Sequence, residues 1–379
     1  MAICPKNAIS MLPDQMGFFY PNVDENKCVD CGLCEKVCAF NSDYETLQNF
    51  NEPVIYAARN TDPKVVSESQ SGGVFFTLAE KILREGGIVY GAGYDEDFCV
   101  KHKRAETLEN LSELRKSKYV QSDMVDCFHL AMRDIKEGRN VLFSGTPCQI
   151  AGLNAFLNLK KVDLGCLYTC SLVCHGTPAP QIWRDNLDYI EKKTGEKISG
   201  VNFRNKKLYG WRSHHETYTF SGSNKILTSR LYTDLFYKHL TLRYCCGSCH
   251  FSNFNRPSDI SIADFWGIGK IKPEWEKEDK GVSLVIISTT KGQDLFDGVK
   301  DYFEYLPSNK EQCAQPNLLH SSELSSNRDA FEKEFLEKGF MYVAKKYGTI
   351  GIRYQIKRVI RAFSHLPQRI SKFFKKRKL

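Results

Sequence analysis

The stretch Cys28-Val29-Asp30-Cys31-Gly32-Leu33-Cys34-Glu35-Lys36-Val37-Cys38 places four cysteines at C-x2-C-x2-C-x3-C spacing. A further cysteine, Cys4, is followed by Pro5 and lies 24 residues before Cys28. Structural zinc sites favour two well-separated C-x2-C pairs, whereas 4Fe-4S clusters are held by cysteines in such a run. We therefore predict an iron-sulfur cluster at this end of the chain, with zinc as the alternative.

The spacing also predicts which thiols share a cluster. In two-cluster bacterial ferredoxins the fourth cysteine of each run, often followed by proline, ligates the other cluster. By that topology one cluster takes Cys4, Cys28, Cys31 and Cys34. Cys38 is then assigned to a second cluster. Met1-Ala2-Ile3 would be the three residues that separate the third cysteine of another run from its fourth, which is Cys4. We expect residues 1–45 to be a ferredoxin-type domain that is truncated at its N-terminus or is a one-cluster remnant.

Composition sets the class of protein. The chain has 379 residues, of which 42% are apolar, enough for a sizeable core and two or three domains. No run of apolar residues is long enough to span a membrane and no signal peptide is recognisable, so we expect a cytoplasmic protein. Fifteen cysteines in a reducing compartment favour metal ligands over disulfides. The cysteine content therefore predicts redox chemistry.

The positive charge is concentrated at the C-terminus. The net charge is +8, yet residues 351–379 hold ten Lys or Arg and no Asp or Glu. These residues alternate with apolar ones at helix-compatible spacing, which predicts either peripheral contact with the inner membrane surface or a solvated terminus. We do not expect nucleic acid as a partner, because no basic patch with interleaved aromatic residues lies outside this tail.

Two segments are candidates for binding a nucleotide cofactor. Ser71-Gly72-Gly73 precedes an amphipathic helix predicted over 74–83, and Gly86-Gly87 ends it before a buried strand at 88–92. Such a turn offers backbone N–H groups to a phosphate, although most such turns are only helix caps. The second segment, residues 115–122, combines cations, hydroxyls and an aromatic ring. Its alternative interpretation is an exposed basic loop.

Four further cysteines come from three segments. A strand over 141–144 leads to Thr146 and Pro147, which suit the N-cap and first position of a helix and place Cys148 in its first turn. There the helix dipole favours the thiolate. The other thiols follow in Cys174-His175-Gly176 and in Cys246-x2-Cys249, beside Cys245. A second cluster, a zinc site and a redox-active C-x2-C pair all remain open from these residues alone.

The chain resembles the coenzyme F420 hydrogenase/dehydrogenase beta subunit family, which are flavin and iron-sulfur proteins. The matching motifs are Ser71-Gly72-Gly73, Ser117-Lys118-Tyr119-Val120-Gln121-Ser122, Gly145-Thr146-Pro147-Cys148-Gln149, Cys174-His175-Gly176, Phe203-Arg204, Gly210-Trp211 and Ser258-Asp259-Ile260 with Asp264-Phe265-Trp266-Gly267. The resemblance implies an FAD held by Ser71, Gly72, Gly73, Lys118, Tyr119, Gln121 and Ser122. It implies a second 4Fe-4S cluster on Cys148, Cys174, Cys246 and Cys249, with Cys246 favoured over Cys245.

The resemblance also implies a function. We expect an oxidoreductase that passes electrons between 4Fe-4S clusters and FAD, and so to or from an organic substrate or deazaflavin coenzyme, with ferredoxin or another redox protein as partner. A non-catalytic electron-transfer subunit and a zinc-stabilised scaffold are the alternatives. The sequence identifies no catalytic side chain. His175 and His250 are more easily explained as structural, and Asp264 and Trp266 as supporting the fold near the cofactor.

The predicted fold class is α+β with mixed sheets. We expect the ferredoxin-like unit to be followed by a mixed α/β body in two regions, 60–150 and 151–305. A buried strand is predicted over 282–288. Residues 306–379 are predicted to form a helical, peripheral and basic tail.

Overall fold

A computed structural model describes residues 1–40, 50–124, 126–352, 354 and 356. Its strands are β1 (Ile9–Pro13), β2 (Phe19–Val23), β3 (Val54–Asn60), β4 (Ile88–Tyr94), β5 (Val100–Ala105), β6 (Val141–Gly145), β7 (Leu167–Leu172), β8 (Ile198–Asn202), β9 (Glu216–Phe220), β10 (Ser223–Ser229), β11 (Ile260–Asp264), β12 (Ser283–Ile287) and β13 (Phe303–Ser308).

The α-helices are α1 (Leu33–Lys36), α2 (Pro63–Glu68), α3 (Val74–Arg84), α4 (Leu108–Leu114), α5 (Cys127–Lys136), α6 (Pro147–Leu159), α7 (Pro180–Thr194), α8 (Lys206–Tyr209), α9 (Leu231–Tyr237), α10 (Pro273–Glu278), α11 (Thr290–Asp297), α12 (Lys310–Cys313), α13 (Arg328–Lys338) and α14 (Phe340–Lys346). Short 3-10 helices are η1 (Tyr244–Ser248), η2 (Ile268–Lys270), η3 (Lys300–Tyr302) and η4 (Pro316–Leu318).

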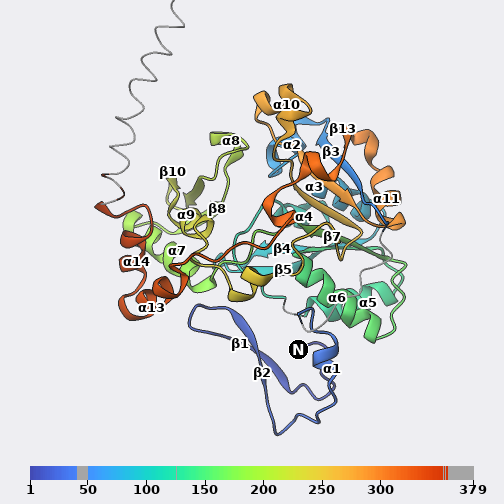
Figure 1. Cartoon of the computed structure of the whole chain (residues 1–379), viewed down its shortest axis with the longest axis horizontal. Coiled ribbons are helices and arrows are strands. Elements are labelled where there is room, and N and C mark those ends of the chain that lie inside the picture. The colour runs from blue at the N-terminus through green and yellow to red at the C-terminus, as the bar shows by residue number, and fades with distance from the viewer. Residues whose placement is uncertain (41–49, 125, 353, 355, 357–379) are drawn as a thin grey trace, which may run out of the picture.

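The body is built on one mixed sheet, in the order β13-β3-β12-β11-β7-β6-β4-β5 (Figure 1). The strands β4, β6, β7 and β11 run parallel to one another at its centre, while β5 at one edge and β12, β3 and β13 at the other are antiparallel to their neighbours. All five residues of β6 are buried, as expected for a strand covered on both faces. The α+β fold class with mixed sheets is confirmed.

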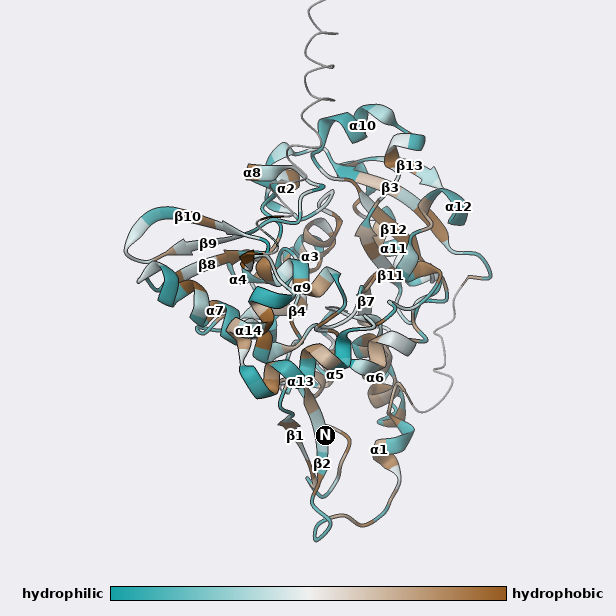
Figure 2. Ribbon diagram, turned by 60° about the vertical axis from the view of Figure 1, so that its left-hand side comes forward, coloured by the Kyte–Doolittle hydropathy of each residue, from teal (hydrophilic) through white to brown (hydrophobic). Residues whose placement is uncertain are grey.

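Helices cover both faces of this sheet, and the apolar residues gather where helix meets strand (Figure 2). One face packs against α3, α4 and α11, and the other against α5 and α6. The helix predicted over 74–83 is α3, whose buried residues include Val74, Leu78 and Ile82 at the spacing of one helical face. The strands predicted at 88–92, 141–144 and 282–288 are β4, β6 and β12.

A second unit of the body contains the three-stranded sheet β10-β9-β8 with α7, α9, α13 and α14. Its core also receives Met16 and Phe18 from the turn of the β1–β2 hairpin. The backbone N–H of Gln181 donates to Met16 O at 2.9 Å. Gly17 lies so close that a Cβ atom there would stand 2.8 Å from the Gln181 nitrogen. The ferredoxin-like unit is therefore anchored to the body through its hairpin turn.

The C-terminal region, predicted to be helical from residue 306, begins instead with the end of a strand. Residues 306–308, expected to be helical, belong to β13, which pairs with β3 and extends the main sheet. Leu306 is partly buried against the core under β12, so its pattern is that of an edge strand. Helices α13 and α14 follow later, and the basic tail from residue 357 onward lies outside the described residues. The proposed domain boundaries stay predictions, and both body regions contribute strands to the same sheet.

The described helices include none with the length and apolar character needed to cross a bilayer.

Candidate cofactor sites

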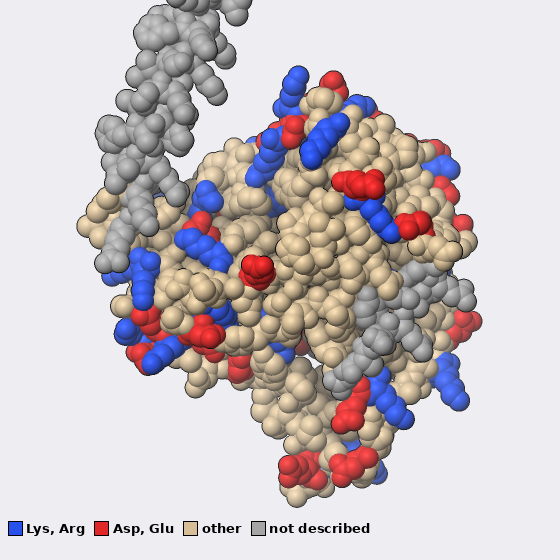
Figure 3. Space-filling model, in the orientation of Figure 1, with Lys and Arg blue, Asp and Glu red and all other residues tan. Residues whose placement is uncertain are grey.

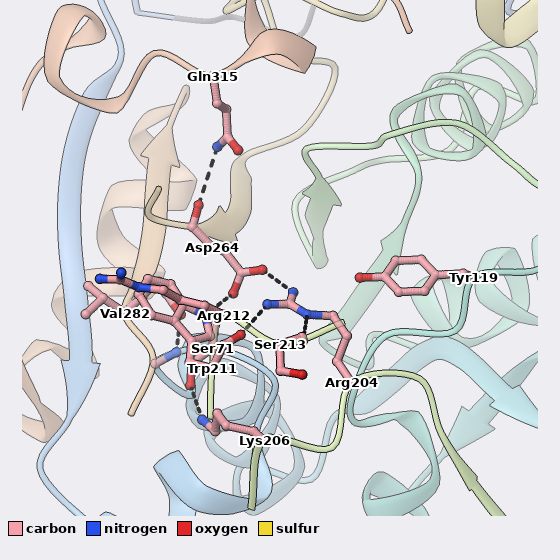
Figure 4. A network of polar contacts seen from close by, with 12 residues as sticks. Ser71, Tyr119, Arg204, Lys206, Trp211, Arg212, Ser213, Asp264, Val282 and Gln315 are labelled. Atoms are coloured by element: carbon pink, nitrogen blue, oxygen red, sulfur yellow. Dashed lines mark hydrogen bonds and ion pairs between the residues drawn. The ribbon is translucent and has the colours of Figure 1, made fainter. Parts of the chain in front are cut away.

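A buried ion pair stands at the centre of the body (Figure 4). Arg204 is 3% exposed and donates to the Asp264 carboxylate, to Trp211 O at 2.6 Å and to Ser213 O at 3.4 Å. The other Asp264 oxygen accepts from Trp211 Nε1 at 2.5 Å. Burial opposes the charge on Arg204, but Asp264 outweighs it and raises the Arg204 pKa. The motifs Phe203-Arg204, Gly210-Trp211 and Asp264-Phe265-Trp266 are thus parts of one network.

Aromatic rings surround this ion pair. Trp211 stacks on Trp266 with centroids 5.0 Å apart, and Arg204 lies over Trp266 at 5.4 Å. His214 packs edge-on against Tyr237 at 4.6 Å, and its Nδ1 atom is buried without a hydrogen-bond partner. Burial, with the neighbouring Arg204 charge, lowers the His214 pKa to about 4, so the imidazole is neutral at pH 7.

The Ser71-Gly72-Gly73 turn is packed tightly between strands β3 and β12. Ser71 Oγ donates to Val282 O at 2.7 Å, and the Gly72 N–H donates to Ser283 Oγ at 2.9 Å. A Cβ atom on Gly72 would stand 2.2 Å from Ala58 O, so only glycine fits. Gly73 has φ +96° and is the N-cap of α3. The Ser71 hydroxyl and the Gly72 amide are therefore engaged within the protein, and the phosphate contact stays a prediction.

A cluster of cations surrounds this turn, drawn from residues 115–118 and 206–207. Lys206 Nζ donates to Val66 O at 2.5 Å and to Ser71 O at 3.0 Å. Arg115 donates to Val65 O and to Ser69 Oγ, each at 3.1 Å. Burial lowers the Lys116 pKa, and the charges of Lys207 and Arg115 lower it further. Burial lowers the Lys206 pKa to about 7, with Arg204 and Lys116 adding to the effect. Glu68 pairs with Arg115 at 3.1 Å and Asp264 opposes the shift at Lys206, so carboxylates neutralise this group of cations only in part.

Two observations show that this cluster has capacity for a ligand. Gln70 Nε2 and Arg115 Nε are buried donors without a hydrogen-bond acceptor. A cavity of about 550 Å³ adjoins the cluster at Lys206 and Lys207. Its lining also includes Asn60, Val66, Ser67, two further cations (Arg59 and Lys280) and three carboxylates (Glu278, Asp279 and Glu304). Its volume falls in the range of small-molecule sites. Orphaned donors, clustered cations and the cavity fit the anionic diphosphate of a dinucleotide.

The four residues predicted at 118–122 lie in four different surroundings. Lys118 Nζ donates to Arg115 O at 2.8 Å, and burial with the neighbouring Lys116 and Lys103 charges lowers its pKa to about 7. Tyr119 stacks on Phe236 at 5.0 Å. Gln121 Oε1 accepts from the Phe19 N–H at 2.9 Å, and Ser122 Oγ donates to His102 Nδ1 at 2.5 Å.

Lys118 therefore belongs to the cation cluster, and Tyr119 to the aromatic group around Tyr237. Gln121 ties the body to the ferredoxin-like unit, and Ser122 fixes a buried histidine. The assignment of Gln121 and Ser122 to a flavin stays a prediction, and their present partners are protein groups.

The thiols of the second group, Cys148, Cys174, Cys246 and Cys249, influence one another electrostatically. The charge of Cys249 acts on both Cys148 and Cys174, and Cys174 acts on Cys246. Gly176 has φ +106°, and a Cβ atom there would meet Cys246 Cβ at 3.4 Å. Backbone N–H groups point at two sulfurs: Gly176 N donates to Cys174 Sγ at 3.4 Å, and Thr177 N donates to Cys246 Sγ at 3.3 Å.

Four thiols are a donor set that a 4Fe-4S cluster takes, and also one that a structural zinc ion takes. Within residues 1–40, 50–124 and 126–352, no three Cys, His, Asp or Glu side chains stand together at the geometry of one metal ion. A 4Fe-4S cluster binds each thiolate to a different iron, so its sulfur ligands are spread further apart than around one zinc ion. Amide hydrogen bonds to the sulfurs are among the features that tune such clusters. The four-cysteine assignment stays a prediction that the donor set fits.

The predicted stabilisation of the Cys148 thiolate by its helix is wrong for the free thiol. Thr146 is the N-cap of α6 as expected, its N–H donates to Gln149 Oε1 at 2.9 Å, and its hydroxyl lies 3.2 Å from Cys148 Sγ. Burial nevertheless raises the Cys148 pKa to about 11, outweighing the hydroxyl and the Gln149 N–H. Burial likewise raises the Cys174 pKa to about 12. Iron, rather than the helix dipole, would have to supply the charge that ionises these thiols.

The ferredoxin-like unit, with β1, β2 and α1, lies at the lower end of Figure 1, beside the N-terminus. Cys4 Sγ accepts from the Ala8 N–H at 3.3 Å, a contact that lowers the Cys4 pKa. The charges of Cys4 and Cys34 both act on the amino group of Met1, so these two thiols are neighbours across the motif. Phe40, two residues after Cys38, contacts His250, the neighbour of Cys249, at a centroid distance of 5.8 Å. The run therefore ends beside the second thiol group.

Sequence reasoning missed Lys206 and Lys207 as site residues. The signal was present, because Phe203-Arg204 was recognised as a motif and a lysine pair follows it after one residue. Only the fold shows that α8 places these lysines against a turn more than 130 positions earlier in the chain. Arg115 was recognised within its segment, but its contact with Ser69 was not.

The fold and thiol groups define an iron-sulfur protein of the oxidoreductase class. Models of the coenzyme F420 hydrogenase/dehydrogenase beta subunit match residues 55–128 with its N-terminal part and residues 138–310 with its C-terminal part. A 4Fe-4S dicluster domain model matches residues 1–42. The chain belongs to the coenzyme F420 hydrogenase/dehydrogenase beta subunit family.

Solved structures include a similar chain in the F420-reducing [NiFe] hydrogenase complex from Methanosarcina barkeri. It shares 20% sequence identity, with a TM-score of 0.48, over 81% of this chain and 95% of that one. Among curated proteins, none matches.

Proposed function

We propose that this protein is an iron-sulfur flavoprotein that exchanges electrons between 4Fe-4S clusters and FAD, and so with an organic substrate or a deazaflavin coenzyme. The observation that carries the flavin assignment is the cation cluster around residues 69–73, with its two orphaned donors and adjoining cavity. When bound, FAD converts between one-electron and two-electron transfer, which clusters alone do not do.

The chain's own residues have separate roles in this proposal. Lys116, Lys206 and Lys207 neutralise the diphosphate, and the Gln70 amide donates to it. The ion pair of Arg204 with Asp264 holds the indoles of Trp211 and Trp266 in place beside the site. His214 is neutral, and its buried Nδ1 has no hydrogen-bond partner in the protein, so it is the one group of this aromatic cluster proposed to pair with a bound ligand.

The cysteines are proposed to hold two clusters. Cys4, Cys28, Cys31 and Cys34 form the outer set, and Cys148, Cys174, Cys246 and Cys249 form the inner set. Cys31 and Cys34 are exposed, which places the outer set within reach of a redox protein partner, whereas the inner thiols are partly buried. The contact of Phe40 with His250 brings the two sets together.

A non-catalytic electron-transfer subunit is the second candidate. The family is named for a subunit of larger enzymes, and both interpretations share the same cofactors. They differ in whether the isolated chain turns over an organic substrate.

Iron, zinc and flavin content per chain after anaerobic purification tests the proposal first. About eight iron atoms and one FAD are expected. About four iron atoms would remove one cluster assignment, and zinc without flavin would refute the redox function. An FAD-loaded chain without turnover on deazaflavin or other hydride acceptors would favour the subunit role.

A further inference from the structure

The solvent-facing side of α14 carries large apolar side chains as well as charged ones, unlike a usual solvated helix face. Phe340, Val343 and Ala344 point into the core, whereas Met341, Tyr342, Lys345 and Lys346 are exposed. Met341 and Lys345, and likewise Tyr342 and Lys346, are four residues apart and so adjacent on the helix. Lys338, at the end of α13, lies over the Tyr342 ring at 4.5 Å. The face therefore combines large apolar side chains with lysines.

Acidic residues near this face are already engaged. Glu334 on α13 pairs with Lys338 and Lys346, and Lys333 pairs with Glu337. Lysine and arginine side chains, with some acidic ones between them, lie over α13 and α14 close to the point where the chain leaves the body (Figure 3). Helix α14 itself contains two lysines at its C-terminal end and no acidic residue.

The chain continues from α14 with two exposed isoleucines. Ile352 is 77% exposed, more than any other large apolar side chain among the described residues, and Ile356 is 53% exposed. The backbone is helical at Ile352, Tyr354 and Ile356, so the two isoleucines share a face. Burial of these two exposed isoleucines against an apolar surface would be favourable.

The sequence beyond the described residues extends this pattern. Val359, Ile360 and Phe363 follow Ile356 at spacings of three, four and seven residues, and Lys357, Arg358 and Arg361 fall between them. Residues 351–379 hold ten Lys or Arg and no acidic residue. Such a pattern is typical of segments that lie in a membrane interface, with apolar side chains in the acyl boundary and cations at anionic headgroups.

We infer that the α14 face, with Ile352 and Ile356, docks on the surface of an anionic lipid membrane. The ten cations of residues 351–379 match the charge of such a surface, and its acyl boundary accepts Met341, Tyr342 and the isoleucines. Nucleic acid would match the charge but offers no apolar layer for the isoleucines. This inference does not depend on the cofactors, and it gives the proposed electron-transfer protein a location.

Vesicle flotation of the full chain tests the inference. Phosphatidylcholine vesicles are compared with vesicles that also contain phosphatidylserine, at low and at high salt. Binding is expected to be at least ~10-fold stronger with the anionic lipid, and high salt should remove most of the difference. Replacing the last four cations (Lys375→Gln, Lys376→Gln, Arg377→Gln and Lys378→Gln) should weaken binding by ~100-fold or more.

Apolar insertion is tested separately from charge. The double variant Ile352→Ser with Ile356→Ser should bind anionic vesicles at least ~5-fold more weakly, with an unchanged melting temperature. Ile226→Ser is the matched control, since Ile226 is 50% exposed but belongs to β10 and not to α14 or residues 351–379, and this variant should bind like the original chain. Equal binding to both kinds of vesicle would overturn the inference, as would an unaffected isoleucine variant. Displacement from the vesicles by duplex DNA or RNA at equal salt would also overturn it.

Discussion

Lys206→Met should make the protein more stable and its flavin binding weaker. Lys206 is partly buried and donates to the carbonyls of Val66 and Ser71. Its charge is disfavoured by Arg204, Lys116 and Arg115 and favoured by Asp264. A charge in this position costs free energy in the empty protein. In our proposal the protein keeps this charge, despite the loss of stability, because the charge binds the FAD diphosphate.

The size of both effects follows from the structure. Burial lowers the Lys206 pKa from 10.5 to about 7, which corresponds to ~5 kcal/mol between charged and neutral forms. Methionine removes that cost but leaves two carbonyls without their donor, so we expect a net gain of about 1–2 kcal/mol in unfolding free energy. One charge-assisted hydrogen bond to phosphate contributes about 1.5–3 kcal/mol, so FAD affinity should fall ~10- to 100-fold.

The pH dependence has a defined sign. A folded-state pKa below the unfolded value means that the unfolded chain binds more protons between about pH 7 and 10.5. The contribution of Lys206 to stability should therefore rise with pH across that window and be at its lowest below pH 7. Lys206→Met should abolish this rise. FAD affinity of the original chain should fall as pH rises above about 7, because the amine loses its charge.

Urea unfolding of the flavin-free chain between pH 6 and 10 and FAD titration by fluorescence quenching measure the two effects. Lys225→Met, at an exposed lysine of β10, controls for loss of a surface charge and should change neither. If Lys206→Met left FAD affinity unchanged while stabilising the chain, the lysine would not face the flavin. If the variant lost both stability and affinity, the two carbonyl contacts, and not the buried charge, would dominate.

Three further predictions concern the thiols and the fold. Cys148→Ser or Cys174→Ser should lower the iron content from about eight to about four per chain, whereas Cys245→Ser should retain it; equal loss in all three variants would contradict the choice of Cys246. Asp134→Ala should lower the unfolding free energy by about 3–5 kcal/mol, because Arg104 and the buried Tyr90 hydroxyl would lose their shared partner; a change under 1 kcal/mol in denaturant melts would refute that role. Gly72→Ala should cost about 3 kcal/mol or more, since its Cβ would stand 2.2 Å from Ala58 O, and a normal melting temperature would show that the turn shifts freely.

Local sequence patterns predicted the elements that depend on neighbouring residues. The helix α3 follows from its apolar spacing, and α6 from Thr146, Pro147 and Gln149, which form the cap that their residue types suit. The buried strands β6 and β12 read as apolar runs. These signals lie within a few residues of one another, so the sequence contains them in full.

Features that depend on distant contacts were not predicted. Lys206 reaches a turn some 135 positions away, and the pKa of Cys148 is set by the surrounding protein rather than by its own helix. Residues 306–308 were expected to be helical, but pairing with β3 makes them a strand. In each case a tertiary contact or burial outweighs the conformational or electrostatic preference of the local sequence. A single sequence does not show which distant segments will contact one another.

Residues 115–122 connect all the proposed sites. Arg115, Lys116 and Lys118 stand at the cation cluster, while the Tyr119 hydroxyl lies 3.4 Å from that of Tyr237, whose ring packs against His175 beside Cys174. Gln121 then accepts from the Phe19 amide of the ferredoxin-like unit. A ligand that repositions the lysines therefore acts on a segment whose other end contacts the hairpin of the ferredoxin-like unit and, through Tyr237, the histidine next to Cys174. FAD binding should therefore affect the ferredoxin-like unit through residues 115–122, without direct contact between FAD and that unit.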